Sequence, residues 1–406
     1  PLYSRQNVEW RVGFPVNDYT SISIASPIYR LTANEFERTK QKLTEILALR
    51  IPEKTSVKFV WIIDNPTALS PHVKKWFRHV EITDTRVRIR VNYANLGASA
   101  SRTRAWNECH SDWMLFLDDD VEVDKDIIVE YVKKIKHNPN VAGYVGFSEL
   151  SYNYSISTNG VHFAQTSFFW HIAAFAEEMG IPVPWGVTAN ILFRWKPGVR
   201  FETIYPKTGG GEDIDFCITL CRQWNLPLLP AKKAKVVHPW WDSGKVYHIA
   251  KRHFNWALGD GLLISRFPTI SYISLPNAVE LMVLVLLWNI WMRGILPILA
   301  IVIGEILATY LFIIIKRNRD FYEQFHKIKK HRTQSILYSV LYRNASRLGQ
   351  LVSHLKHGNY TCIFHRFEWL VGQLPHQESE NRKRELLHNM SMVLTGSILY
   401  FIFGWF

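Results

Sequence analysis

Cysteine is scarce in this sequence, with four in 406 residues. A chain of this length with so few cysteines is not held together by a disulfide framework. No two cysteines form a CxxC pair, so we do not expect a structural zinc site. Cys217 and Cys221 are four residues apart, and we interpret them as core residues on one face of a helix rather than as a bridge.

Charged residues are also few, at 20%, whereas hydrophobic residues make up 48% of the chain. This composition excludes an intrinsically disordered protein. The sequence contains neither an internal repeat nor a low-complexity tract. Its length is sufficient for two or three ordinary domains with a sizeable core.

Acidic residues are outnumbered, 35 against 48 Lys and Arg, which gives a net charge of +13. Such an excess predicts an acidic partner, which could be a phosphate group, a nucleic acid or an anionic membrane. Residues 316–389 alone contain 14 Lys and Arg but only six Asp and Glu, and they lie between apolar stretches. Because the excess is gathered there, we expect no nucleic-acid partner.

Two long apolar stretches, 272–292 and 294–315, follow each other closely, and a shorter one covers 390–406. The first two each have roughly the 20 residues that a helix needs to cross a bilayer. They predict membrane-spanning helices. The alternative is a helical hairpin buried in a soluble domain, with Glu280 and Glu305 facing protein groups.

These stretches predict a domain organisation for an integral membrane protein. Residues 271–315 would form a transmembrane hairpin, 316–389 a basic cytosolic or interfacial helical segment, and 390–406 a third transmembrane helix that is cut short. Loops rich in Lys and Arg stay on the cytoplasmic side, so residues 1–270 would lie there too. Apolar residues at helical spacing between 336 and 355 predict an amphipathic helix, either on the membrane surface or packed on the soluble domain.

The first 270 residues alternate between strand and helix patterns, which predicts an α/β domain with a mostly parallel sheet and helices on both faces. The expected strands are 21–26, 57–63, 87–92 and 113–117, and the expected helices include 33–49 and 97–109. Ligands of such sheets bind at the carboxyl ends of the strands. Ser26, Pro27 and Asp64 stand at two of those ends.

Three aspartates, Asp118, Asp119 and Asp120, follow the strand expected at 113–117. Adjacent carboxylates repel each other unless a cation neutralises them. Asp118 and Asp120 point the same way on an extended chain and could bind one divalent ion. The alternative interpretation is a solvated acidic turn.

A second motif, GGGEDID at 209–215, combines three glycines with Glu212 and Asp213 at the expected start of a helix. Acidic residues often stand at helix N-termini because of the helix dipole. That explanation leaves the three glycines unexplained, so we favour a catalytic loop in which a carboxylate accepts a proton from a hydroxyl group.

His238 ends another expected strand and could be a further ligand of the same divalent ion, although a lone histidine is often structural. Trp185, Trp240 and Trp241 are candidates to stack on the apolar faces of a sugar. With 16 tryptophans in the chain, each of these three could equally belong to an interface or to a belt at the bilayer surface.

Taken in order, several segments resemble the inverting family-2 glycosyltransferases, whose nucleotide-sugar-binding domain is of the GT-A type. They are SISIASPIY at 21–29, NLGASASRTRAWN at 95–107, FLDDDV at 116–121, GGGEDIDF at 209–216 and VVHPWW at 236–241. The resemblance covers roughly residues 18–265. It implies a GT-A domain within residues 1–270 and a hexosyltransferase that uses a nucleotide-diphosphate sugar, with UDP as the expected nucleotide.

The resemblance also implies roles for individual residues. Ser26 with Pro27 and Asp64 would hold the nucleoside, and Asn95, Gly97 and Arg102 would line the nucleotide pocket. Asp118 would contact the nucleotide or its metal, and Asp119 would bind the nucleotide sugar. Asp120, with Asp118 and His238, would bind Mn²⁺ or Mg²⁺. Asp213, beside Glu212, would be the catalytic base.

One departure from the family bears on the acceptor. Processive polysaccharide synthases carry a QxxRW motif, whereas this chain reads RHFNW at 252–256. Arg252 and Trp256 could still contact the acceptor. We therefore expect transfer to a membrane-associated glycan or lipid. The alternatives are a processive synthase that exports its polymer, in which a homo-oligomer could supply further spans, and a non-catalytic scaffold or sugar-binding protein on the same fold.

Overall fold

The computed structural model describes residues 19–151, 155–164, 166, 168–240, 245–289, 295–316, 332–373 and 375–404. They form two compact units. The sheet unit contains the described residues up to 151 and from 169 to 240, and the helical unit contains 155–168 and the described residues from 245 onward.

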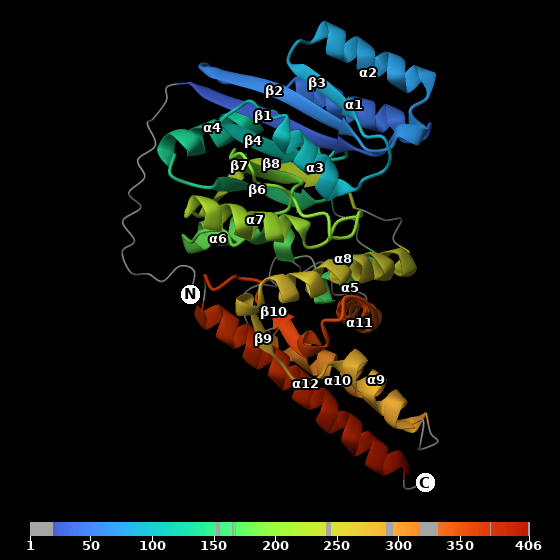
Figure 1. Cartoon of the computed structure of the whole chain (residues 1–406). Helices are drawn as coiled ribbons and strands as arrows, with labels where there is room; N and C mark the ends of the chain where they lie inside the picture. Colours follow the sequence, from blue (N-terminus) through green and yellow to red (C-terminus); the bar gives the residue numbers. More distant parts are fainter. Residues whose placement is uncertain are drawn as a thin grey trace. The chain divides into compact units, whose positions relative to one another are not determined.

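The sheet unit is built around eight strands in the order β3-β2-β1-β4-β7-β6-β8-β5 (Figure 1). Their bounds are β1 Thr20–Ile28, β2 Thr55–Ile63, β3 Val87–Val91, β4 Trp113–Leu117, β5 Glu122–Val123, β6 Gly143–Leu150, β7 Asn190–Arg194 and β8 Leu228–His238. Pairing is parallel between β1 and β2, β1 and β4, β2 and β3, and β6 and β8. β7 is antiparallel to both of its neighbours, and β5 is antiparallel to β8. The prediction of an α/β fold with a mostly parallel sheet is confirmed.

The helices of the sheet unit connect and cover these strands. They are α1 Phe36–Leu47, α2 Pro71–Thr83, α3 Ala98–Asn107, α4 Ile127–His137, α6 Ile172–Met179 and α7 Glu212–Trp224. α3 packs on β1 and β2, and α4 and α6 pack on β8. The central strand β4, with sequence WMLFL, is buried along its whole length, as a continuous apolar run in a covered sheet requires.

The position of β1 in the sheet creates a place for a ligand. The chain runs outward from β1 to β2 and β3, and then returns to place β4 on the other side of β1. At such a switch point the connections leave a crevice beyond the carboxyl ends of the two strands. Residues 29–30 and 118–120, which directly follow β1 and β4, therefore meet at one edge of the sheet.

The helical unit consists of α5 Ile156–Ala164, α8 Val246–Arg266, α9 Ala278–Asn289, α10 Leu296–Lys316, α11 Arg332–Lys356 and α12 Pro375–Gly404, with a short antiparallel pair of β9 Ser271–Ile273 and β10 His365–Phe367. α11 packs against α8 and α5, and α10 packs against α12. α11 is the helix predicted around residues 336–355, and it is packed on its own unit.

The prediction of an integral membrane protein, with transmembrane helices in 271–315 and 390–406 and its catalytic domain on the cytoplasmic side, is wrong. No helix among the described residues combines the length and the apolar character that crossing a bilayer requires. The first apolar stretch begins with β9, and the described part of α9 covers the 12 residues Ala278–Asn289. Residues 390–404 are the last part of α12, which begins at Pro375.

The start of α9 has a local cause. The side chain of Asn277 accepts hydrogen bonds from the backbone N–H groups of Val279 and Glu280, at 3.0 and 3.1 Å, and Glu280 accepts one from the N–H of Asn277 at 2.9 Å. This reciprocal arrangement is a capping box, which fixes the first turn of the helix at this point. The apolar run counted from residue 272 is therefore divided between a strand, a loop and a helix.

The two glutamates within the apolar stretches are paired with arginines. Glu305 is fully buried, and its carboxylate lies 2.8 Å from Arg347 and 3.7 Å from Arg343. Glu280 lies 2.8 Å from Arg366. Both acidic side chains thus face protein groups, as buried charges require.

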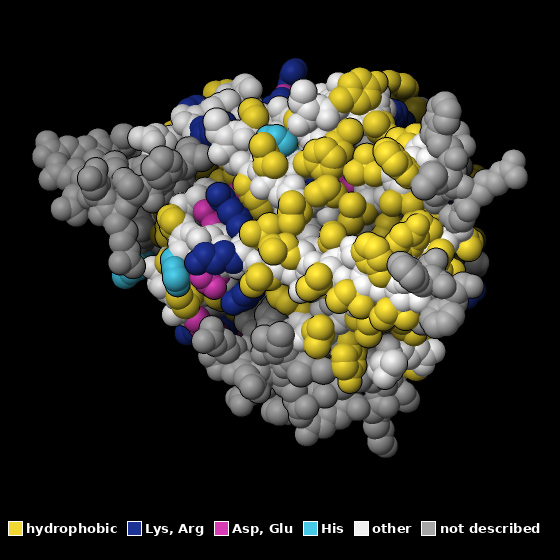
Figure 2. All heavy atoms as spheres, turned by 90° about the horizontal axis from the view of Figure 1, so that it is seen from below, with side chains coloured by type: hydrophobic (Ala, Val, Ile, Leu, Met, Phe, Trp, Pro, Cys, Tyr) yellow, Lys and Arg dark blue, Asp and Glu magenta, His cyan; other side chains and the backbone are white. Residues whose placement is uncertain are grey.

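The helical unit also exposes many hydrophobic side chains, which gather on the face shown in Figure 2. They belong mainly to α9, α10 and α12 and include Leu286, Leu287, Leu299, Ile303, Leu394 and Ile398.

Candidate active site

The three aspartates after β4 point to different partners. Asp118 is half-buried, and its Oδ1 lies 3.2 Å from Nη2 of Arg102. Asp119 is almost completely buried and is bound by the Arg30 side chain and by the backbone N–H groups of Tyr29 and Arg30, at 3.1 and 3.4 Å. Burial raises the pKa of the Asp119 carboxyl, and Arg30 opposes that increase. Asp119, a predicted nucleotide-sugar-binding residue, has both oxygens engaged by protein groups.

Asp120 is buried, and its two carboxylate oxygens face different side chains. Its Oδ2 lies 2.8 Å from Nη2 of Arg30, and its Oδ1 lies 3.7 Å from Nε2 of His238. Among the described residues, Oδ1 has no hydrogen-bond partner. A buried carboxylate oxygen without a donor is costly and suggests that another group binds there.

His238 is the last residue of β8, and its ring is held in place from two sides. Its Nδ1 lies 2.7 Å from the carbonyl oxygen of Pro239, and the ring of Trp170 lies against it with centroids 4.8 Å apart. Because a carbonyl oxygen only accepts, the proton of this contact is on Nδ1, and in the neutral ring Nε2 is then the nitrogen with a lone pair. Asp118, Asp120 and His238 offer ligand atoms that all lie within 4.8 Å of one another.

This cluster fits a divalent cation. It supplies two carboxylates and a neutral imidazole, a donor set that suits Mn²⁺ and also Mg²⁺. The unpartnered Oδ1 of Asp120 and the orientation of the His238 ring are the two structural observations that support this interpretation.

The glycine motif forms the loop that leads into α7. Gly209, Gly210 and Gly211 have φ values of +90°, +124° and +89°, which only glycine adopts without strain. Glu212, the first residue of α7, accepts hydrogen bonds from the N–H of Gly210 at 2.6 Å and from Arg102 at 3.0 Å. The predicted loop and helix start are confirmed, and Glu212 acts as the structural anchor of the loop.

Asp213 is half-buried, and its Oδ1 accepts a hydrogen bond from the N–H of Ile214 at 2.9 Å. Burial and the neighbouring charge of Glu212 raise the pKa of Asp213 to about 8, and Arg102 opposes that increase. A carboxylate with such a pKa is a stronger base than an ordinary aspartate, as a group that accepts a proton near neutral pH needs to be.

Asp64 stabilises the loop before α3. Its oxygens accept hydrogen bonds from the Asn92 side chain at 2.7 Å and from the N–H groups of Leu96 and Gly97 at 2.9 and 2.8 Å. Asn95 lies in this loop, and its side chain also accepts from the N–H of Gly97, at 3.1 Å. The predicted nucleoside contact of Asp64 would have to share a carboxylate that already accepts three hydrogen bonds.

Ser26, with Pro27 in β1, was predicted to contact the nucleoside. Ser26 is fully buried, and its hydroxyl has no hydrogen-bond partner among the described residues. Sequence reasoning missed Lys207, whose Nζ donates to the carbonyl oxygen of Asn95 at 2.8 Å and whose backbone lies against Gly97. Lys207 lies between two motifs in the sequence and belongs to neither, so no sequence pattern indicated a functional role for it.

The predicted acceptor residues are divided between the two units. Trp185 is buried against Phe169, and the N–H of Trp240 donates to the Ser151 hydroxyl at 2.8 Å. Trp241 lies outside the described residues. Arg252 and Trp256 belong to the helical unit, where the guanidinium lies over the indole at 5.3 Å.

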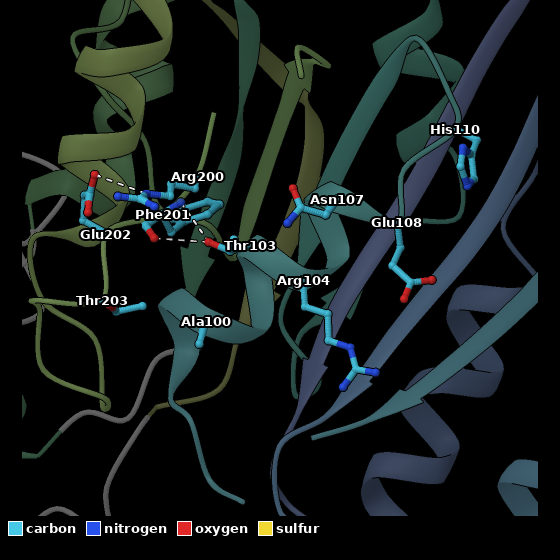
Figure 3. A pocket seen from close by; sticks show the side chains of 10 residues that line it. All are labelled: Ala100, Thr103, Arg104, Asn107, Glu108, His110, Arg200, Phe201, Glu202 and Thr203. Carbon is cyan, nitrogen blue, oxygen red and sulfur yellow. Dashed lines mark hydrogen bonds and ion pairs between the residues drawn. The ribbon is translucent and has the colours of Figure 1, made fainter. Parts of the chain in front are cut away.

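Two surface hollows lie on the sheet unit. One, of about 750 Å³, lies at the carboxyl ends of β1 and β2 and is lined by residues that include Tyr29, Asn65 and His72. The other, of about 630 Å³, lies between α3 and residues 200–203 (Figure 3). Its lining groups bind one another, because the Thr103 hydroxyl both donates to and accepts from the backbone of Phe201. Neither hollow is lined by a predicted site residue.

Comparison with known proteins gives one sequence match. Residues 31–189 match the family described as Glycosyl transferase family 2. This segment runs from the loop after β1 to the residue before β7 and includes Asp64, Arg102 and residues 118–120. No curated protein sequence matches the chain.

Among solved structures, the chain is similar to the mannosyltransferase PcManGT from Pyrobaculum calidifontis in complex with GDP-Man and Mn²⁺. The identity is 11% and the TM-score 0.45, over 96% of this chain and 90% of that one. It is also similar to GalNAc-T7 with UDP, GalNAc and Mn²⁺, at 14% identity and a TM-score of 0.40, over 61% of this chain and 50% of that one. Both similarities are low, and the family match carries the assignment. Residues 31–189 thus match the glycosyl transferase family 2 model, and the protein is a glycosyltransferase.

Proposed function

We propose that the protein is a GT-A type enzyme that transfers a sugar from a nucleotide-diphosphate sugar, with inversion at the anomeric carbon, to a hydroxyl group of a glycan or lipid acceptor. The observation that carries this proposal is the cluster of Asp118, Asp120 and His238 at the switch point of a domain whose sequence matches family-2 transferases. UDP-sugars are the first donors to test.

Asp118, Asp120 and His238 would hold the divalent cation, Mn²⁺ or Mg²⁺. When bound, such an ion stabilises the negative charge that develops on the departing nucleoside diphosphate. Asp120 would bind through Oδ1, since Oδ2 is engaged by Arg30. His238 would bind through Nε2, since Nδ1 is engaged by the Pro239 carbonyl oxygen.

Asp213 would be the catalytic base. In the proposed step, its carboxylate accepts the proton of the acceptor hydroxyl while that oxygen forms the new bond to the anomeric carbon and the bond to the diphosphate breaks. The raised pKa of Asp213 supports this role. Arg102 joins the two parts of the site, because it binds both Asp118 and Glu212.

The nucleoside would lie along the ends of β1 and β2, where Ser26 and the loop held by Asp64 are located. Trp240, Arg252 and Trp256 remain predicted acceptor residues. The unpaired hydroxyl of Ser26 supports a polar ligand at this end of the sheet.

A screen of nucleotide-diphosphate sugars tests the proposal. Purified protein is incubated with each sugar donor and Mn²⁺, and release of the nucleoside diphosphate is measured with and without candidate acceptors. We expect release from at least one donor, and loss of that release in Asp120→Asn. If no donor is turned over, or if Asp120→Asn retains full activity, the proposal is rejected.

A further inference from the structure

Arg30 is a residue near the proposed metal site that the motifs did not single out. It lies just after β1 and beside the aspartates that follow β4, because the two strands are parallel neighbours. The backbone of Arg30 is fixed on its other side, where its carbonyl oxygen accepts a hydrogen bond from the Thr39 hydroxyl of α1 at 2.8 Å.

The guanidinium of Arg30 bridges two adjacent carboxylates. It binds Oδ1 of Asp119 and lies 2.8 Å from Oδ2 of Asp120. The planar fork of an arginine suits such a bridge, because its donors have fixed directions. Backbone N–H groups also donate to Asp119, so the carboxylate that the other end of the guanidinium binds is itself fixed in position.

This bridge decides which oxygen of Asp120 remains available. With Oδ2 engaged by Arg30, the other oxygen, Oδ1, faces Nε2 of His238 at 3.7 Å and has no donor among the described residues. Rotation of the carboxylate would break the contact with Arg30. The orientation of Asp120 toward His238 is therefore set before any cation is bound.

We infer that Arg30 is a positioning residue that fixes Asp120 as a metal ligand through Oδ1. This inference rests on the proposed metal site. Arg30 binds neither the cation nor the sugar in this role. It holds the ligand at the geometry that the cation requires, and partners that orient metal ligands typically contribute about 10- to 100-fold to metal affinity.

Arg30 also has a second effect on the affinity for the cation, which is opposite in sign to positioning. Its positive charge repels a cation close by, so charge alone predicts that removing Arg30 strengthens metal binding. Positioning predicts that removing it weakens binding. The sign of the change in Mn²⁺ affinity therefore distinguishes the two effects.

The experiment is a titration of the full chain with Mn²⁺, in which electron paramagnetic resonance measures both the free ion and the spectrum of the bound ion. The variants are Arg30→Met, Arg30→Lys and Asp120→Asn. Arg50→Met is the matched control, since Arg50 forms a 2.7 Å ion pair with Asp126 elsewhere on the same unit. Thermal unfolding without metal verifies that each variant is folded.

We expect Asp120→Asn to lose binding, Arg50→Met to bind as the wild type does, and Arg30→Met to bind about 10-fold more weakly or worse, with an altered spectrum of the bound ion. Arg30→Lys keeps the charge but cannot bridge both carboxylates, so it should also bind weakly. It serves as the test if Arg30→Met does not fold.

Two results would overturn the inference while leaving the metal site in place. They are unchanged or tighter binding in Arg30→Met, and full wild-type affinity in Arg30→Lys, which would show that charge alone is enough. If the wild type binds no Mn²⁺, or if Asp120→Asn binds it equally well, the proposed metal site itself fails and the inference fails with it.

Discussion

Arg102 donates a hydrogen bond to Glu212 over 3.0 Å, although 110 residues separate the two in the sequence. The other end of the same guanidinium lies 3.2 Å from Asp118. One buried cation thus connects the aspartates after β4 with the first turn of α7. The two acidic motifs are parts of a single site.

Replacing Arg102 with methionine should destabilise the sheet unit. The change leaves Glu212 buried without its partner, and breaking a buried ion pair typically costs about 3–5 kcal/mol. We expect the free energy of unfolding to fall by about that amount in urea titrations. Arg102→Lys, which keeps the charge but can reach only one carboxylate at a time, should lose less. A methionine variant as stable as the wild type would show that the bridge is unimportant for folding.

Asp213→Asn should abolish transfer while leaving donor binding intact. A positioned base contributes about 10²–10⁴-fold to the rate, so the turnover number should fall by that factor. Turnover and nucleotide affinity are measured separately, by product release and by calorimetry. Asp215→Asn is the matched control, because the Asp215 carboxylate is engaged by the Tyr205 and Thr219 hydroxyl groups. Wild-type turnover in Asp213→Asn would remove this residue from the mechanism.

The rate of transfer should increase with pH around the pKa of Asp213. Burial, reinforced by Glu212, raises that pKa to about 8, and only the deprotonated carboxylate accepts a proton. Below that pH, kcat/KM should decrease by about tenfold for each pH unit. The profile is measured from about pH 6 to about pH 9. A flat profile over this range would contradict the assignment.

The same shift predicts an effect on stability. The folded state keeps a proton on Asp213 that the unfolded state loses near the ordinary value of 3.8, so the free energy of unfolding should decrease as the pH rises from there toward 8. Asp213→Asn removes this dependence. The variant should therefore gain stability relative to the wild type at alkaline pH, with the difference disappearing in acid. Thermal unfolding across this pH range measures the difference.

Removing the metal should remove activity reversibly. Because Asp118, Asp120 and His238 supply the proposed ligands, a chelator should stop transfer and added Mn²⁺ should restore it. Asp120→Ala should make nucleotide affinity independent of Mn²⁺, as measured by calorimetry with UDP in the presence and absence of the ion. Equal dependence on Mn²⁺ in wild type and variant would place the ion elsewhere.

Gly97→Ala should destabilise the protein more than Gly180→Ala. Both glycines have positive φ values, +89° and +62°. Gly180 is in the left-handed helical region, where alanine is strained by about 1–2 kcal/mol, whereas the ψ of 171° places Gly97 in a region that essentially only glycine adopts. At Gly97 a Cβ would also lie 2.8 Å from the Cα of Lys207, whereas at Gly180 it would meet nothing within 4 Å. The difference between the two free energies of unfolding measures the backbone strain at Gly97 together with the close approach of the Lys207 backbone, and equal losses would show that the loop adapts.

The sequence by itself determined the local structure of the sheet unit. Strands β1 to β4, the end of β8, helices α1, α3 and α7 and the loop at 209–211 follow from local patterns, since side-chain periodicity and the φ requirement of glycine depend on near neighbours. Strands β5, β6 and β7 and helices α2, α4 and α6 were not predicted. It also determined the residue types at the strand ends. Local patterns led to a wrong prediction for the apolar stretches, which were expected to be membrane-spanning helices. Counting apolar residues does not reveal the helix cap at Asn277, which divides the first stretch.

Only the tertiary structure decided which of these groups meet. The contacts of Asp120 with His238, of Arg102 with Glu212, and of Arg30 with Asp119 and Asp120 join strand ends and loops that are distant in the chain. They depend on the order of the strands, above all on the return of the chain that places β4 beside β1. Strand order is set by the packing of the whole core, which no local pattern specifies. For that reason the sequence predicted the groups of the site, and the fold determined how their oxygens and nitrogens are shared.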